Sequence, residues 1–200
     1  MILALALAAS VALTQSGPLP VVALVPLGPV EAKQLEEIST AITDRLNVTV
    51  RLERQRKLPP AAYYAPRKRW RAEKLLEALT ADPPEGAWKV LAVTKAEIST
   101  TKDEIYDWGI GGLGDIGGTA CVVSSYLLRK HSRTEEVLLR RLTDLAVHEL
   151  GHTLGLDHCP TEGCVMRDAY GKLIRSIDSS TGQFCESCRR KLRTGLLKQR

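Results

Sequence analysis

The sequence lacks any hydrophobic run long enough to cross a lipid bilayer as a helix. Such a helix needs about 20 consecutive apolar residues, whereas the apolar run in MILALALAASVALTQS at the N-terminus has only about a dozen. No Lys or Arg precedes that run. We therefore expect no membrane span, and we interpret residues 1–18 as a signal-like segment or an apolar extension. A single domain over residues 19–200 is expected to follow.

A strong charge excess is also missing. The chain has 28 Lys and Arg against 23 Asp and Glu, a net charge of +5 that is too small to indicate a nucleic-acid partner. Nine basic residues and two acids do lie between Arg51 and Lys74. No stacking-aromatic module accompanies them, so we interpret this stretch as a solvated surface, with a phosphate-binding patch as the alternative.

The region after Pro20 alternates between strand-like and helix-like patterns. Apolar or alternating runs predict strands at residues 21–25, 48–52, 89–94 and 120–128. Helical spacing of apolar residues predicts helices at residues 31–46 and at about 67–79. The first three elements are strand, helix and strand, which favours a parallel βαβ unit and an α/β domain.

A glycine-rich stretch, WGIGGLGDIGG, occupies residues 108–118. Gly109, Gly111 and Gly114 fit the GxGxxG spacing, but a dinucleotide loop needs a strand before it and a helix after it. Here more glycine and the strand-like ACVVSSYLL follow, so we reject a dinucleotide site. Cys121 in that strand has no base near it in sequence, and we interpret it as an inert core residue.

Histidine is scarce, yet three of the four histidines lie between residues 148 and 158. His148 and His152 are four residues apart and share one face of a helix. That helix is predicted to begin near Ser132, which forms a capping-box pattern with Glu135. A glycine at position 155 then ends the helix, so that His158 can return towards the first two histidines.

The resulting pattern, HExxHxxGxxH, predicts a zinc-dependent peptidase. Three imidazoles can bind zinc and leave one position open for water. Glu149 is placed to accept a proton from that water as it attacks a peptide carbonyl. The expected partner is a peptide or protein substrate. A non-catalytic, zinc-stabilised binding module is the alternative, and the intact Glu149 argues against it.

Four of the five cysteines lie after residue 158, as Cys159 with Cys164 and Cys185 with Cys188. The odd total argues against a framework made only of disulfides. Two close pairs of thiolates indicate a closed, structural zinc site, so we expect two zinc ions per chain. Disulfides are the alternative for an exported protein. The thiolate site favours the cytoplasm and the apolar N-terminus favours export, so both locations stay open.

These motifs together resemble a known protein family. HExxHxxGxxH followed by Met166 resembles the metzincin clan, and HC-x4-C-x-M with the later CxxC resembles its archaemetzincin branch. VVALVPLGPV, PPAAYYAPRKRW and ACVVSSYLL are similar to that family as well, so the resemblance covers roughly residues 20 to 195. It implies one compact α/β domain with a mixed twisted sheet, an antiparallel edge strand, an active-site helix and a zinc-stabilised C-terminal segment.

The resemblance also implies a role for each site residue. The catalytic zinc would be held by His148, His152 and His158, and the structural zinc by Cys159, Cys164, Cys185 and Cys188. Glu149 would be the general base, and Met166 the Met-turn residue beneath the catalytic metal. Residues 109–118 are our candidate for an edge strand that binds an extended substrate. The sequence departs from some other metzincins in having no tyrosine two residues after Met166. We expect the protein to be a monomer.

Overall fold

The computed structural model describes residues 18–198 of the chain. The predicted signal-like segment therefore lies outside the described residues, except for Pro18. Within residues 18–198, no helix is both long enough and apolar enough to cross a membrane.

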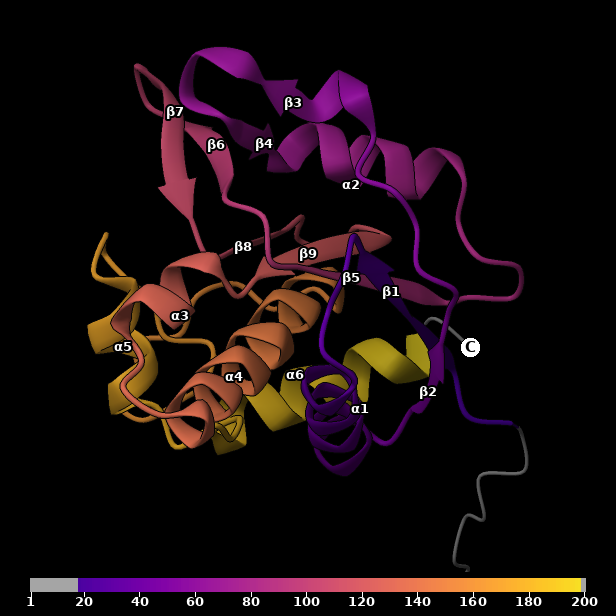
Figure 1. Cartoon of the computed structure of the whole chain (residues 1–200). Coiled ribbons are helices and arrows are strands. Elements are labelled where there is room, and N and C mark those ends of the chain that lie inside the picture. The colour runs from indigo at the N-terminus through magenta and orange to yellow at the C-terminus, as the bar shows by residue number, and fades with distance from the viewer. Residues whose placement is uncertain (1–17, 199–200) are drawn as a thin grey trace, which may run out of the picture.

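A five-stranded sheet forms the centre of the molecule (Figure 1). Its order is β2-β1-β5-β9-β8. The strands are β1 (Val21–Leu27), β2 (Thr49–Leu52), β5 (Lys89–Thr94), β8 (Gly112–Gly114) and β9 (Ala120–Ser124). The first four strands in the order run parallel, and β8 pairs antiparallel with β9. The mixed sheet with an antiparallel edge strand, implied by the family resemblance, is thus confirmed.

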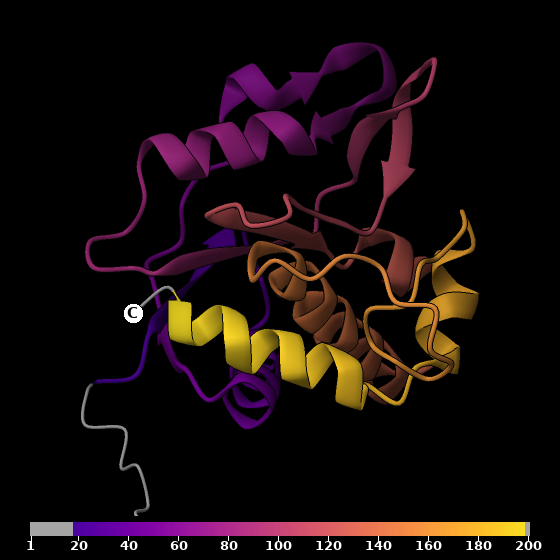
Figure 2. The same ribbon diagram turned by 180° about the vertical axis from the view of Figure 1, so that it is seen from behind.

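Helices cover one face of this sheet, as both views show (Figures 1 and 2). They are α1 (Ala32–Leu46), α3 (Tyr126–His131), α4 (Glu135–Thr153), α5 (Leu173–Ser179) and α6 (Glu186–Lys198). Because side chains alternate along a strand, Val22 and Leu24 of β1 join the core beneath α1 and α4. The predicted apolar stripe of α1 is buried, and it contributes Leu35, Ile38, Ile42 and Leu46 to that core.

The opposite face carries α2 (Ala72–Ala81) and a second sheet. This sheet has the order β3-β4-β6-β7. Its strands are β3 (Tyr63–Tyr64), β4 (Arg69–Arg71), β6 (Ile98–Lys102) and β7 (Ile105–Ile110). Two short 3-10 turns, Pro60–Ala62 and Ala65–Arg67, flank β3. The sequence did not predict this second sheet.

Three predicted boundaries are wrong for local physical reasons. The helix expected from residue 67 begins only at Ala72, because Lys68 is left-handed (φ 53°) and residues 69–71 pair with β3 and β6. The strand expected over residues 120–128 ends at Ser124, whose hydroxyl donates to the Ala96 carbonyl and accepts from the Tyr126 amide. These two bonds turn the chain into α3.

The third boundary is the start of α4. Thr134, not Ser132, is its N-cap, and its hydroxyl accepts a bond from the Val137 amide at 3.4 Å. The Ser132 hydroxyl donates instead to the Leu128 carbonyl at the end of α3. The predicted capping box is therefore absent, although Glu135 still lies in the first turn of α4.

Candidate functional site

The last two turns of α4 carry His148 and His152. The helix ends in a Schellman motif, in which the Gly155 amide donates to the His152 carbonyl and the Leu156 amide to the Gly151 carbonyl. This motif requires a left-handed residue, and Gly155 has φ +87°. The chain reverses there and brings His158 back to the helix, as the sequence predicted.

The three imidazoles converge on one point. The Nε2 atoms of His148 and His152 lie 3.1 Å apart. The His158 ring centroid lies 5.4 Å from that of His148 and 4.9 Å from that of His152. One ring nitrogen from each histidine falls within 4.8 Å of the other two. Three nitrogens at such separations can surround a single metal ion.

Hydrogen bonds on the far side of two rings fix their tautomers. Nδ1 of His148 lies 2.7 Å from the Val165 carbonyl, and Nδ1 of His152 lies 2.8 Å from the Leu156 carbonyl. A carbonyl can only accept, so each Nδ1 carries the proton and each Nε2 presents a lone pair. Two lone pairs facing each other at 3.1 Å repel unless a cation lies between them. The donor set therefore fits zinc.

Burial also keeps these histidines neutral. Burial and the neighbouring His152 lower the pKa of His148 to about 4. Burial likewise lowers the pKa of His152. An imidazole must be neutral to bind a metal through its free nitrogen, and these shifts keep both rings neutral at neutral pH.

Glu149 lies between the two helical histidines in sequence and beneath β8 in space. Its side chain is buried, and burial raises the pKa of the carboxyl to about 8. A divalent cation beside the carboxyl would favour its charged form and lower this pKa again. A Cβ added at Gly112 would stand 2.6 Å from Cγ and Oε1 of Glu149. The absence of a side chain at Gly112 of β8 therefore leaves room for this carboxyl.

A cleft of about 640 Å³ opens along these residues. All three histidines and Glu149 line it. Residues 108–114 of β7 and β8 form one part of the lining, and residues of α5 with its flanking loops form another. The glycine-rich stretch thus lies at the cleft, and β8 is the edge strand of the central sheet.

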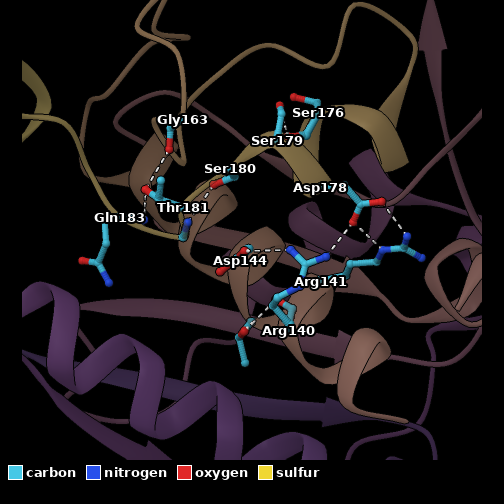
Figure 3. Close-up of polar contacts among 12 residues, drawn as sticks. Arg140, Arg141, Asp144, Gly163, Ser176, Asp178, Ser179, Ser180, Thr181 and Gln183 are labelled. Atoms are coloured by element: carbon cyan, nitrogen blue, oxygen red, sulfur yellow. Dashed lines mark hydrogen bonds and ion pairs between the residues drawn. The ribbon is translucent and has the colours of Figure 1, made fainter. Parts of the chain in front are cut away.

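Ion pairs hold the α5 part of this lining against α4 (Figure 3). Asp178 of α5 accepts hydrogen bonds from Arg140 at 2.6 Å and from Arg141 at 2.9 and 2.6 Å. Beyond α5, the amide and hydroxyl of Thr181 both donate to the Gly163 carbonyl at 2.9 Å. The bonds of Asp178 connect one wall of the cleft to the helix that carries the histidines, and those of Thr181 connect it to the loop after that helix.

The four C-terminal cysteines form a second cluster. Their sulfurs lie within 4.8 Å of one another, with 3.7 Å between Cys159 and Cys185 and 3.8 Å between Cys164 and Cys188. Four sulfurs placed 2.3 Å from a zinc ion at tetrahedral angles would be about 3.8 Å apart, whereas a disulfide needs about 2.05 Å. All four cysteines are free. Their geometry fits a tetrahedral metal and not a disulfide.

The electrostatic setting of Cys185 also suits metal binding. Burial opposes its ionisation, but hydrogen bonds from the Cys188 backbone and the Thr161 side chain lower its pKa to about 6. The thiolate form, which is the form that binds metal, is therefore accessible to Cys185 at neutral pH, whereas burial raises the pKa of Cys164 and of Cys188. Cys121 lies outside the cluster and is fully buried, and burial raises the pKa of its thiol well above the ordinary range. The interpretation of Cys121 as a core residue is confirmed.

Met166 is fully buried beneath α4. A Cβ at Gly151 would stand 2.5 Å from the Met166 sulfur, so the methionine packs directly on the helix backbone between His148 and His152. Tyr170, farther along, is largely exposed. His131, the histidine outside the motif, is exposed as well.

Several contributors to the site could not be predicted from the sequence. The Val165 and Leu156 carbonyls act through backbone atoms, which carry no residue-type signal. Asp168 lies 3.7 Å from Nδ1 of His158, close enough for attraction but too far for a hydrogen bond. Gly112 was noted as part of the glycine-rich run, but its contact with Glu149 depends on tertiary packing.

Comparisons with known proteins find similar sequences over most of the chain. A family model described as Peptidase family M54 matches residues 35–194. An archaemetzincin of Halobacterium salinarum is 30% identical over 174 residues, which cover 84% of this chain and 96% of the relative. An archaemetzincin of Haloarcula marismortui is 29% identical over 176 residues, covering 84% of this chain and 97% of the relative.

Solved structures share the fold. The crystal structure of archaemetzincin from Methanopyrus kandleri has a TM-score of 0.78 and 25% sequence identity, and the match covers 92% of this chain and 99% of that one. Archaemetzincin from Archaeoglobus fulgidus, crystallised in complex with malonate, has a TM-score of 0.70 and 24% identity, with 86% and 99% covered. At that lower identity the similarity concerns the fold alone.

Proposed function

The chain belongs to peptidase family M54, the family of the archaemetzincins, and is a zinc metallopeptidase; from this premise we propose that it hydrolyses peptide bonds with Glu149 as general base. His148, His152 and His158 would hold the catalytic zinc. The observation that carries the proposal is the convergence of three imidazoles and one buried carboxyl in a single cleft.

The chemistry divides between the metal and the chain. Zinc bound by the histidines would polarise the peptide carbonyl and lower the pKa of water towards about 7. Glu149 would take the proton that the attacking water loses and return it to the leaving amine. Its buried position beneath β8 holds the carboxyl in the cleft and keeps bulk water away from it.

An extended peptide is the substrate form that the cleft favours. β8 is an edge strand, and within residues 18–198 no strand pairs with its other edge, to which an extended substrate could add. Gly112 and Gly114 place no side chain between the strand and the cleft. The backbone of β8 would therefore bind the substrate main chain, and the cleft would accommodate its side chains.

The cysteine cluster would hold a second zinc with a structural role. Four cysteines leave no coordination position for water or substrate, which is typical of a structural site. Met166 would form the hydrophobic floor beneath the histidines, as its contact with Gly151 suggests. Two zinc ions per chain follow from these assignments.

Glu149→Gln is the variant that tests the proposed mechanism. The amide keeps the shape of the side chain but cannot accept a proton, so peptide hydrolysis is expected to fall by roughly 10²- to 10⁴-fold. Zinc content is expected to stay unchanged, because the three histidines remain. Turnover of a fluorogenic peptide library and metal content are measured on the same preparation.

Glu136→Gln is the matched control, because Glu136 is an exposed acid on the same helix. It should retain both activity and metal. Undiminished hydrolysis in Glu149→Gln would exclude Glu149 as the base. A fully metallated wild-type protein that cleaves no peptide in the library would favour a non-catalytic binding module instead.

A further inference from the structure

We propose that the cysteine cluster positions the histidine cluster, so that metal bound to the cysteines strengthens metal binding by the histidines. The cysteine cluster consists of Cys159, Cys164, Cys185 and Cys188, and the histidine cluster of His148, His152 and His158. The inference rests on the assignment, proposed above, of one zinc to each cluster. It makes the cysteines positioning residues for the catalytic centre.

The first connection between the clusters is covalent. Cys159 directly follows His158 in the chain. Unlike His148 and His152, His158 lies beyond the end of α4, so the helix does not fix its position. Its side chain is 43% exposed. The location of the His158 backbone therefore depends on what holds Cys159.

The second connection is a hydrogen bond. The Val165 carbonyl lies 2.7 Å from Nδ1 of His148 and sets its tautomer. Val165 directly follows Cys164 in the chain, and its amide donates to the Gln183 carbonyl at 2.9 Å. Cys164 also forms an isolated β-bridge with Gln183, two residues before Cys185. A shift of Cys164 would move the carbonyl that orients His148.

The third connection is a hydrogen bond within the segment that follows α4. The Cys159 amide donates to the Met166 carbonyl at 2.8 Å. The backbone after His158 is thereby bonded to the backbone after Val165. Residues 156–172 contain no helix or strand, apart from the single bridge at Cys164. Regular secondary structure therefore does not hold this segment, and the cysteine cluster links it to Cys185 and to Cys188 of α6.

The size of the effect follows from what is known of residues that orient metal ligands. Loss of such a residue typically weakens metal binding by about 10- to 100-fold. Met166 packs beneath α4 and would retain part of the segment without the cysteines. We therefore expect weakened binding by the histidines, not its abolition.

The double variant Cys185→Ser/Cys188→Ser tests the coupling in the full-length protein. Both residues lie on the C-terminal segment, away from the histidines in sequence. Cobalt(II) reports each cluster separately, because only the cysteine cluster gives a sulfur-to-cobalt charge-transfer band. Chelator competition should show about 10- to 100-fold weaker cobalt binding at the histidines, with helix content retained in circular dichroism. Unchanged affinity in the folded variant would overturn the inference.

Cys188→His is the matched rescue variant, because zinc and cobalt accept a Cys3His site. It should restore near wild-type affinity at the histidines, and a failure to do so while the Cys3His site binds metal contradicts the inference. If the double variant does not fold, His158→Ala gives the reciprocal measurement. Thermodynamic linkage requires that metal at each cluster change the metal affinity of the other by the same factor. An unchanged cobalt affinity of the cysteine cluster in His158→Ala would therefore also overturn the coupling. Wild-type protein that binds cobalt only through sulfur would instead overturn the proposed function.

Discussion

At position 112 the lack of a side chain allows β8 to lie directly on Glu149. A Cβ there would come within 2.6 Å of the carboxyl group, closer than real Cβ atoms approach a neighbour. Gly109 differs, since a Cβ there would have its nearest contact with Arg69 at an ordinary 3.7 Å. Of these two glycines, only Gly112 is required by a close contact with Glu149.

Gly112→Ala is therefore expected to displace Glu149 or β8. A misplacement of about 1 Å can reduce a rate by roughly 100-fold, so a drop of about that size in kcat is expected. The histidines keep their own hydrogen bonds, and zinc content should be retained. Steady-state kinetics and metal content measure the two quantities.

The matched control is Gly109→Ala, which should keep most of the activity. Equal losses in the two variants would show that the contact with Glu149 is not responsible. Loss of metal from Gly112→Ala would point to a more general disturbance of α4.

At the scale of elements, α5 is held on α4 by one carboxylate and two arginines (Figure 3). Arg141 is nearly buried, with 8% of its side chain exposed, while Asp178 is 38% exposed. The hydrogen bond from Arg141 lowers the pKa of Asp178 below its ordinary 3.8. Since α5 lines the cleft, this ion pair connects stability with the shape of the site.

Asp178→Asn should lower the free energy of unfolding by about 1 kcal/mol at neutral pH, a value reduced by the solvent exposure of the carboxylate. A carboxyl with a lowered folded pKa stabilises above its unfolded pKa, and this contribution is lost as pH falls through the folded pKa. The difference between wild type and variant should therefore begin to shrink below a pH of about 4 and vanish only once the pH lies below the lowered folded pKa. Urea unfolding at a series of pH values measures it.

Asp44→Asn serves as the control, because Asp44 is exposed on α1 and has no ion pair in the part of the chain that the structure describes. It should change stability little at any pH. A constant difference between Asp178→Asn and wild type across the pH series would contradict the assigned role of the ion pair.

At the scale of the whole molecule, the C-terminal segment meets the rest of the domain at the cysteine cluster. α6 packs on the helical side of the sheet through residues such as Leu192 and Cys188 (Figure 2). Metal binding energy contributes directly to folding where the ligands come from separate segments. We expect about two zinc ions per chain and five titratable thiols after denaturation with a chelator, since all five cysteines are free.

Chelation of the native protein should also lower the melting temperature. Elemental zinc determination, a thiol assay and thermal unfolding test these three expectations together. One zinc ion with fewer than five thiols would indicate disulfides in the cysteine cluster, which the sulfur separations of 3.7 and 3.8 Å do not favour.

Much of the site could be predicted because its pattern is local in sequence. The spacing of His148 and His152 places them on one helical face, and Gly155 provides the left-handed turn that returns His158. The two closely spaced pairs of cysteines also indicated a four-thiolate cluster, and the structure brings the four sulfurs together. Strands over residues 21–25 and 89–94 were recognisable because buried parallel strands read as apolar runs.

The errors arose where distant contacts override local preference. The sequence pattern predicted that residues 69–71 belong to the start of a helix, yet they pair with β3 and β6 in a second sheet. Ser132 matches a capping box, yet its hydroxyl is bonded to the end of the preceding helix. Neither competing partner is visible in the local sequence.

The sequence by itself determined which atoms can bind metal and accept protons, because residue types and short spacings specify that chemistry. Only the tertiary structure decided how those atoms are oriented. The Val165 carbonyl fixes the His148 tautomer, Gly112 makes room for Glu149, and the segment around Cys159 joins the two clusters. These contacts involve backbone atoms and absent side chains, so their effect arises only when separate segments pack together.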